Sequence, residues 1–308
     1  FLENQLESDY PEEISIEDCT FRDCDSSIAG CAMYLKVSST PRIERVSIIG
    51  ITRYDSKSIL ELRTSDESMN EFCLDSCIFE RNSLNNTNEE DGGGTGIFIA
   101  RDDSENSDPY ELTFRNCTWT LNHAIHGGAF SCGKDSTFSE IQLTFIECTF
   151  HRNKADFGNG GALYLRTKRR ITIERCIFTE NDCGEPISGN SNSGKGSITI
   201  DPPDNKTIEP VVIIDTKIHD SKSRGDTTGV CIGPKVQSVT IDHCEFISNS
   251  HSDNLKGSQL VCHSPGIDIS NTIFDFERTS NYGRHVYIDQ RSTMLISNCQ
   301  FLNAKCQE

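Results

Sequence analysis

Cysteine is the residue type in this 308-residue sequence that could most evidently do chemistry, and the sequence contains fifteen cysteines. Seven stand two residues before an aromatic residue in a recurring frame: Cys19, Cys77, Cys117, Cys148, Cys176, Cys244 and Cys299. On the inward face of a strand, such a cysteine is most simply a small buried apolar side chain. The Cα atoms of neighbouring copies such as Cys117 and Cys148 would lie about 5 Å apart, which is within the range for a disulfide. Stacking in register, however, rarely gives the required dihedral angle.

The remaining cysteines of interest fall outside that frame. Cys24, Cys183 and Cys306 follow the aromatic residue, where we expect turns, while Cys73 and Cys231 should point outward. These five are the candidates for disulfides or for bonds to another chain. Because fifteen is an odd number, at least one thiol stays unpaired or bonds outside this chain.

Metal and cofactor sites are not predicted. The sequence has no Cys-x-x-Cys pair, and its eight histidines are scattered without a paired spacing, whereas a structural zinc site needs clustered ligands. The glycine-rich run at 91–96 precedes the strand-like IFIA and lacks the Lys-Ser/Thr pair of a phosphate-binding loop.

The segments that carry these residues repeat along the chain. The clearest copies read LTFRNCTWTLN at 112–122, LTFIECTFHRN at 143–153 and ITIERCIFTEN at 171–181. With the cysteine as position zero, positions −5 and −3 are apolar, −2 and −1 are mostly polar, and zero and +2 are apolar again. This pattern predicts two short strands with one inward face, joined by a bend, and excludes a helix.

Position zero recurs at a regular spacing. It falls at Cys19, Cys77, Cys117, Cys148, Cys176, Thr216, Cys244, Thr272 and Cys299. The step of 58 residues from Cys19 to Cys77 is twice the usual step, so a further copy is expected at 46–53, with Ile51 in the cysteine slot and Arg53 in the aromatic slot. The chain therefore holds ten copies.

A further strand follows in each copy, as in GGAFSC at 127–132 and GGALYL at 160–165. No copy has room for a crossover helix, and so short a unit cannot bury its apolar face alone. We predict an all-β, right-handed parallel β-helix of about ten coils that fills 1–308 as a single domain and is a piece of a longer chain. A β-propeller, the alternative, needs antiparallel blades and longer repeats. Two steps of 40 residues predict inserted loops at about 83–93, 101–109, 184–195 and 201–209.

The repeat also predicts the interior. Aromatic residues at position +2 should form one buried stack: Trp119, Phe150, Phe178, Phe246 and Phe301. Three residues later, Asn122, Asn153 and Asn181 should adopt the left-handed backbone of a turn and hydrogen-bond from coil to coil.

The GGAF and GGAL segments and the FxxN segments at Phe79–Asn82, Phe150–Asn153, Phe178–Asn181 and Phe246–Asn249 resemble the repeats of the polymorphic membrane protein family. These are chlamydial autotransporter adhesins, and related repeats occur in surface proteins of parasitic protists. Trp119 replaces one Phe, and the coils at 216, 272 and 299 lack the Asn. The resemblance implies a passenger region that is displayed on a surface as an adhesin and has no chemistry of its own.

Many parallel β-helices are polysaccharide lyases or glycosidases, whose carboxylates converge from adjacent coils, alone or around Ca²⁺. Two predicted outward tracks, position +1 and the middle of the later strand, do not stack two carboxylates in adjacent coils; the acids gather instead in expected turns such as 89–91 and 102–103. We therefore predict no catalytic residue and no enzymatic activity, with a pectate-lyase-like enzyme as one alternative.

The composition of the chain limits the kinds of partner that it could bind. The net charge of −18 disfavours nucleic acid, and no apolar run is long enough for a membrane-spanning helix. Hydroxyls predicted to be exposed at position −4, on Thr113, Thr144, Thr172 and Thr240, with Tyr164 and Tyr287, suit a protein or carbohydrate ligand. We predict an extracellular or cell-surface interaction protein, with a spacer or filament subunit that pairs end to end as the other alternative.

Three N-x-S/T sequons are candidate glycosylation sites, at Asn85, Asn116 and Asn205. Asn85 and Asn205 fall in predicted insertions, which must protrude. Asn116 occupies the bend beside inward Cys117, where crowding is expected, so we predict that Asn85 and Asn205 carry glycans more fully in a eukaryotic secretory pathway.

Overall fold

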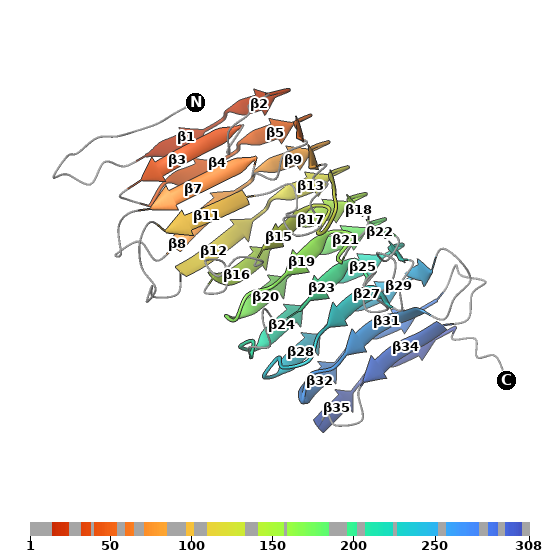
Figure 1. Ribbon diagram of the computed structural model, residues 1–308. Coiled ribbons are helices and arrows are strands. Elements are labelled where there is room, and N and C mark those ends of the chain that lie inside the picture. Colours follow the sequence, from red (N-terminus) through yellow and green to blue (C-terminus); the bar gives the residue numbers. More distant parts are fainter. Residues whose placement is uncertain are drawn as a thin grey trace.

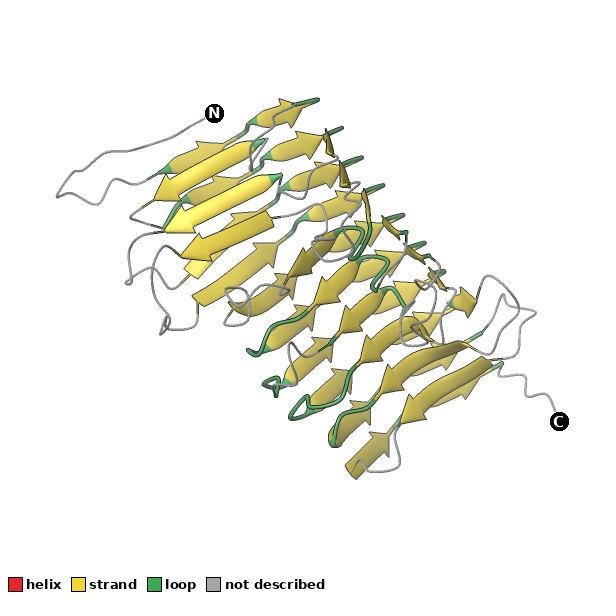
Figure 2. Ribbon diagram, in the orientation of Figure 1, coloured by secondary structure: helices red, strands yellow, loops and turns green. Residues whose placement is uncertain are grey.

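The computed structural model describes residues 14–24, 32–37, 40–53, 59–64, 71–84, 97–101, 110–132, 141–156, 159–184, 196–201, 207–223, 227–251, 257–276, 283–288 and 293–303. Within these ranges the chain forms short strands and no helix, as Figure 2 shows. None of these residues belongs to a helix able to cross a membrane. Neighbouring strands are parallel and stack into an elongated solenoid (Figure 1).

Sheets A and B hold ten strands each. Sheet A contains β1 (Ser15–Glu17), β4 (Arg42–Glu44), β8 (Glu71–Asp75), β12 (Tyr110–Arg115), β16 (Ile141–Ile146), β20 (Ile171–Glu174), β24 (Val211–Ile214), β28 (Val239–Asp242), β32 (Gly266–Ser270) and β35 (Thr293–Ser297). Sheet B contains β2 (Thr20–Arg22), β5 (Ser47–Ile49), β9 (Ile78–Glu80), β13 (Thr118–Thr120), β17 (Thr149–His151), β21 (Ile177–Thr179), β25 (Lys217–His219), β29 (Glu245–Ile247), β33 (Ile273–Asp275) and β36 (Gln300–Leu302).

The rest of each coil is less continuous. Sheet C contains β6 (Thr52–Arg53), β10 (Ser83–Leu84), β14 (His123–Ala124), β18 (Lys154–Ala155), β22 (Asp182–Cys183), β26 (Lys222–Ser223) and β30 (Ser250–His251). Sheet D1 contains β3 (Met33–Val37), β7 (Leu60–Thr64) and β11 (Ile97–Arg101). Sheet D2 contains β15 (Phe130–Cys132), β19 (Leu163–Leu165), β23 (Ile198–Ile200), β27 (Thr227–Ile232), β31 (Gly257–Cys262) and β34 (Gly283–Ile288).

This is the predicted all-β, right-handed parallel β-helix, and parallel pairing throughout rules out the antiparallel blades of a propeller. The number of turns depends on the face. Sheets A and B have ten strands, whereas the longest continuous run on the face of sheets D1 and D2 has six. Most of the predicted loops, at 85–93, 102–109, 185–195 and 202–206, lies outside the described residues. Of their described ends, Ser83–Leu84 forms β10, Arg101 ends β11 and Ile208 bridges to Val236.

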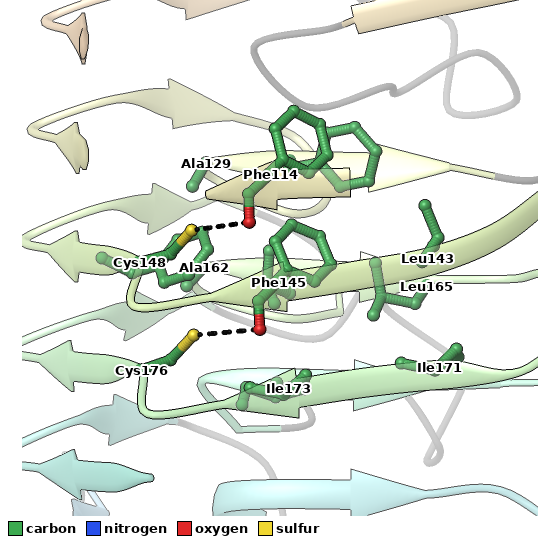
Figure 3. Packing of buried hydrophobic residues seen from close by; sticks show 14 of the residues in the cluster. Phe114, Ala129, Leu143, Phe145, Cys148, Ala162, Leu165, Ile171, Ile173 and Cys176 are labelled. Atoms are coloured by element: carbon green, nitrogen blue, oxygen red, sulfur yellow. Dashed lines mark hydrogen bonds between the residues drawn. The ribbon is translucent and has the colours of Figure 1, made fainter. Parts of the chain in front are cut away.

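The inward positions follow the predicted alternation. In the coil of β16 and β17, Leu143, Phe145, Cys148 and Phe150 at positions −5, −3, zero and +2 are all fully buried. Figure 3 shows this core from close by, with Phe114 above Phe145 and Cys148 above Cys176. The bend at −2 and −1 therefore restores the inward direction, as the sequence pattern requires.

The second coil corrects the predicted register. Ser47 pairs with Thr20 and Ile78, so Val46, rather than Ile51, takes the position of Cys19 and Cys77. The steps around it become 27 and 31 residues, close to those elsewhere. Ile51 fills the Asn slot at +5, where its N–H donates to Asn82 Oδ1 at 3.1 Å. The apolar side chain of Ile51 had suggested the inward position zero of the repeat. Ile51 does point inward, but at position +5.

Two left-handed residues shape almost every coil. They stand at positions −1 and +4, as in Glu147 with φ 56° and Arg152 with φ 52°. The predicted left-handed role of the FxxN asparagines is therefore wrong, because the residue before each Asn takes that conformation. Only the second coil uses glycine at +4, Gly50 with φ 71°.

Replacing Leu121 by glycine should raise the free energy of unfolding by about 1 kcal/mol. Leu121 has φ 58° and is 45% exposed, so the change relieves backbone strain and loses little burial. Urea denaturation measures the effect. Thr120→Gly, in strand β13 next to it, is the matched control and should destabilise the protein.

The aromatic residues at +2 form two stacks. Phe79, Trp119, Phe150 and Phe178 lie face to face with ring centroids 4.4 to 5.1 Å apart. Ile218 then interrupts the column, and Phe246, Phe274 and Phe301 form the second stack. Phe301 corrects the prediction of a wholly buried stack, because it is 45% exposed in the last described strand, with one face on Phe274 and nothing described beyond it.

The asparagine ladder is confirmed. The amide nitrogen Nδ2 of Asn122 donates to Asn153 Oδ1 at 3.0 Å, and that of Asn153 donates to Asn181 Oδ1 at 3.1 Å. Each Nδ2 also donates to the carbonyl of the aromatic residue one coil back, as Asn153 does to Trp119. All three asparagines are buried, so the ladder satisfies polar backbone groups where water is excluded.

The two glycines of GGA have different roles. Gly127 has φ 53°, which glycine adopts without strain. A Cβ on Gly128 would come within 2.4 Å of the Gly161 carbonyl oxygen and 2.5 Å of the Lys154 backbone nitrogen. The second glycine is therefore needed because the chain passes against the next coil.

Candidate binding surface

The outer face of sheet B is the most regular lateral surface of the solenoid. Each strand has three residues in register with its neighbours, and the bends on both sides are tight. The predicted insertions lie elsewhere in the coil, between β10 and β12 and between β22 and β24. All ten strands are described, so the face runs uninterrupted along the described solenoid.

Two columns of outward side chains cover this face. Position +1 carries Thr20, Ser47, Ile78, Thr118, Thr149, Ile177, Lys217, Glu245, Ile273 and Gln300. Position +3 carries Arg22, Ile49, Glu80, Thr120, His151, Thr179, His219, Ile247, Asp275 and Leu302. The middle of the face, which we call the hydroxyl patch, consists of Ile78, Thr118, Thr120, Thr149, Ile177 and Thr179. It presents hydroxyls and methyls. Two further +3 side chains stand among them: Glu80 beside Thr120, and His151 between Thr120 and Thr179.

Polar contacts hold the side chains around the hydroxyl patch. His151 Nδ1 lies 2.9 Å from Thr179 Oγ1, one coil away. Beyond the patch, Lys217 Nζ lies 3.1 Å from Glu245 Oε1, and His219 Nε2 lies 3.4 Å from Glu245 Oε2. Burial lowers the pKa of His219, although Glu245 acts in the opposite direction. The charged groups thus pair with one another: Lys217 with Glu245 beyond the patch, and Glu80, on the strand of Ile78, with Arg81.

Acidification should destabilise the protein below pH 6.5. Burial lowers the pKa of both His219 and His285 from 6.5, so the unfolded chain binds protons that the folded chain does not. The stabilisation is complete above pH 6.5 and is lost as the pH falls toward the lowered folded values. Urea denaturation at about pH 7.5 and about pH 5.5 measures it. The double variant His219→Gln/His285→Gln should show less pH dependence; an unchanged dependence would contradict the assignment.

The predicted hydroxyl track on sheet A is less accessible. Thr113 and Thr144 are only 5% and 9% exposed, and both donate to Glu111 Oε1, at 3.2 and 3.0 Å. Thr172 and Thr240 are half-buried. The expectation of an exposed threonine track at −4 is therefore wrong for Thr113 and Thr144, which are covered by their own sheet.

Tyr164 and Tyr287 both lie on sheet D2, and each contacts a histidine ring from the preceding coil. The ring centroids of Tyr164 and His126 are 5.3 Å apart, and those of Tyr287 and His263 are 6.1 Å apart. Tyr287 is exposed, whereas burial raises the pKa of Tyr164. The predicted aromatic spots thus exist, but on a different face from the hydroxyl patch.

Sequence reasoning missed one carboxylate track. Glu17, Glu44 and Asp75 pair in register at position −2 of the first three coils. Arg45 Nη2 lies 2.8 Å from Glu17 Oε2, and Arg42 Nε lies 2.6 Å from Glu44 Oε1. The hydrogen bond from Arg42 lowers the pKa of Glu44. The misplaced second coil concealed this track, and its arginine pairs are typical of a structural ion-pair network rather than of a general acid.

A second cluster joins the coils of β14 and β18. The ring nitrogen Nε2 of His123 contacts Asp156 Oδ2, and Lys154 Nζ lies 2.7 Å from Asp156 Oδ1. Burial opposes ionisation of Asp156, but Lys154 and His123 outweigh it and lower its pKa. His123 and Asp156 are 33 residues apart, so their spacing in the sequence gave no signal. The contact between His123 and Asp156 thus links adjacent coils, and Lys154 pairs with Asp156 within one coil.

The cysteines outside the frame are placed as follows. Cys73 is half-buried on the outer face of sheet A, and Cys24 packs partly against the core in the first coil. Cys183 is fully buried in β22 rather than in a turn. Cys231 was expected to point outward, because it stands between inward Val230 and Ile232. It is only 3% exposed and therefore not accessible. Cys24 and Cys73 are free thiols, and Cys306 lies outside the described residues.

Of the three sequon asparagines, the structure describes one. Asn116 is exposed at position −1 with φ 52°, and its Nδ2 lies 3.4 Å from Asp75 Oδ1. The predicted crowding is therefore wrong, because the left-handed bend turns the side chain outward. Asn85 and Asn205 lie outside the described residues, so their preference over Asn116 stays a prediction.

Comparisons with known proteins agree with this fold. The family model of the right-handed β-helix region matches residues 129–307, more than half of the chain. No curated protein and no solved structure matches the sequence. The finer resemblance to polymorphic membrane proteins remains a prediction. By its repeat, its parallel sheets and this match, the chain belongs to the right-handed β-helix family.

Proposed function

We propose that the chain is a non-enzymatic, adhesin-like protein of the extracellular space or cell surface, which binds a ligand on a host or neighbouring cell through the outer face of sheet B. The observation that supports this most is the hydroxyl patch on an uninterrupted ten-stranded face. Threonine hydroxyls and isoleucine methyls at fixed spacing suit repeated hydrogen bonds and apolar contacts with a polymer.

Charge favours a neutral carbohydrate among the possible ligands. The chain carries a net charge of −18, so acidic glycans are repelled at long range. The hydroxyl patch offers no cation to offset that repulsion, because Lys217 at its border is paired with Glu245. A neutral polysaccharide has no such penalty and presents hydroxyls that complement those of the patch.

A second candidate function is a spacer or filament subunit that pairs end to end. The last described coil exposes Met294, Leu295, Ile296, Phe301 and Leu302. Such an apolar end is covered most simply by another β-helical layer. Sedimentation over a range of concentrations tests this function, because end-to-end pairing predicts assemblies that grow with concentration and dissociate when Phe301 is replaced by Glu.

The test of the main proposal measures binding and turnover together. Immobilised β-glucan, mannan and galactan serve as neutral glycans, and polygalacturonate serves as the acidic one, with and without Ca²⁺. We expect retention on at least one neutral glycan, no retention on polygalacturonate, and no release of shorter chains from any of them. Glycan cleavage abolished by Glu44→Gln would instead support the polysaccharide-active enzyme, and failure to bind any neutral glycan would refute the proposal.

A further inference from the structure

Four consecutive coils place a cysteine at position zero: Cys77, Cys117, Cys148 and Cys176. We call this set the thiol column. The strands that follow these cysteines pair in register, which sets neighbouring members about 4.8 Å apart along the solenoid. All four are buried free thiols, and Figure 3 shows Cys148 and Cys176 one above the other on the same side of the core.

The sulfur atoms are directed toward backbone carbonyls of the preceding coil. Each Sγ approaches the carbonyl at position −3 of the preceding coil: Cys117 lies 3.3 Å from Leu74 O, and Cys148 lies 3.4 Å from Phe114 O. Each thiol also hydrogen-bonds the carbonyl at position −2 of its own coil, as Cys148 Sγ does to Ile146 O at 3.4 Å. The column is therefore a line of sulfur donors from which water is excluded.

The same solenoid contains a natural counterpart. Cys244 occupies position zero in a coil between Thr216 and Thr272. It is buried like the column cysteines, and its Sγ lies 3.4 Å from Ile213 O. Cys244 thus shares the position, burial and carbonyl contact of the column, but Thr216 and Thr272 take position zero in the two adjacent coils.

We propose that the thiol column binds a soft monovalent cation, Cu(I), in linear coordination between two neighbouring sulfurs. Thiolate sulfur selects Cu(I) over harder ions. A metal–sulfur bond of about 2.3 Å on each side spans about 4.6 Å, close to the spacing between coils. A disulfide needs Cβ atoms only about 3.8 Å apart, so it would have to pull the two coils together.

Coordination number and charge both favour this ion. Among the described residues, no three His, Cys, Asp or Glu side chains converge on one point, which disfavours tetrahedral Zn²⁺. The column instead offers ligands two at a time and in line. One thiolate and one neutral thiol around Cu(I) form a neutral unit, which avoids a net charge in the apolar core. Binding of each ion then releases one thiol proton to solvent.

Two double variants with equal thiol counts test the proposal. Cys77→Ala/Cys176→Ala keeps the adjacent pair Cys117 and Cys148. Cys117→Ala/Cys176→Ala leaves Cys77 and Cys148 two coils apart, about 10 Å, which is too far to share one ion. Each variant retains thirteen of the fifteen cysteines, so binding by the other thiols is matched.

The measurement is the withdrawal of Cu(I) from a chromophoric chelator by the full, reduced chain without oxygen. The variant with the adjacent pair should keep a site, and the variant with the separated pair should bind about tenfold more weakly or not at all. As a second comparison, Cys148→Ala leaves Cys77 and Cys117 as the one adjacent pair of the column and should bind fewer Cu(I) ions than the unaltered chain. Cys244→Ala should bind as many as the unaltered chain, with circular dichroism confirming the fold of each variant. Equal binding by the two double variants, or equal losses in the two single variants, would overturn the proposal. So would a disulfide within the column of protein isolated from its native source.

Discussion

Replacement of Phe150 by alanine is expected to lower the free energy of unfolding by about 3 to 5 kcal/mol. Its ring is fully buried and lies 4.7 Å from that of Trp119 and 4.4 Å from that of Phe178. Parallel coils cannot collapse independently into the gap, because their backbones are hydrogen-bonded on both sides. Trp119 is the only tryptophan, so its fluorescence during urea denaturation reports on this stack.

Phe301→Ala is the control for that prediction. Phe301 occupies the same position of the repeat and stacks on Phe274, but it is 45% exposed. Its replacement should therefore cost about 1 kcal/mol or less. Similar losses in the two variants would mean that burial in the stack is not what stabilises the solenoid.

Replacement of Asn153 by leucine should lower the free energy of unfolding by about 3 kcal/mol or more, a loss similar to that of Phe150→Ala. Asn153 Oδ1 accepts from both the backbone N–H and the Nδ2 of Asn122, and its Nδ2 donates to Trp119 O. Leucine has a similar volume but leaves these buried groups unpaired. Urea denaturation compared with that of the unaltered chain measures the loss.

Ser221→Ala provides the matched control at the same +5 position. Among the described residues, Ser221 Oγ reaches only the His219 carbonyl of its own coil, at 3.4 Å, whereas its backbone N–H still donates to Asn249 Oδ1. The expected loss is about 1 kcal/mol. If Ser221→Ala cost as much as Asn153→Leu, the ladder between coils would not be the source of the stability.

The sequence predicted the fold because the stacking of coils repeats one local problem many times. Each copy must bury positions −5, −3, zero and +2, and the cysteine and aromatic frame marks them plainly from Cys117 to Cys176. The second coil was misplaced because Val46, Ile48 and Ile51 are all apolar and fit more than one register. Gly50 was the available signal, since it stands at the left-handed +4 position.

Whether a side chain is exposed was harder to predict than whether it points inward or outward. Thr113 alternates with inward residues as expected, yet its neighbour Glu111 covers it. Asn116 was expected to be crowded, but the left-handed bend exposes it. Contacts between coils join residues about 30 positions apart, as in the pair of His123 and Asp156. Neither composition nor local periodicity contains that information, so the surface had to come from the structure.

The role of the sheet B face is tested most directly by the binding of charge-altered variants. The ligand is the neutral glycan on which the unaltered chain is retained most strongly. Thr118→Lys/Thr149→Lys places two long cations in the hydroxyl patch, whereas Thr172→Lys/Thr240→Lys makes the same change on sheet A. We expect the first variant to bind about tenfold or more weakly and the second to bind like the unaltered chain. Equal affinity of both variants, or a loss confined to the sheet A variant, would contradict a ligand site on sheet B.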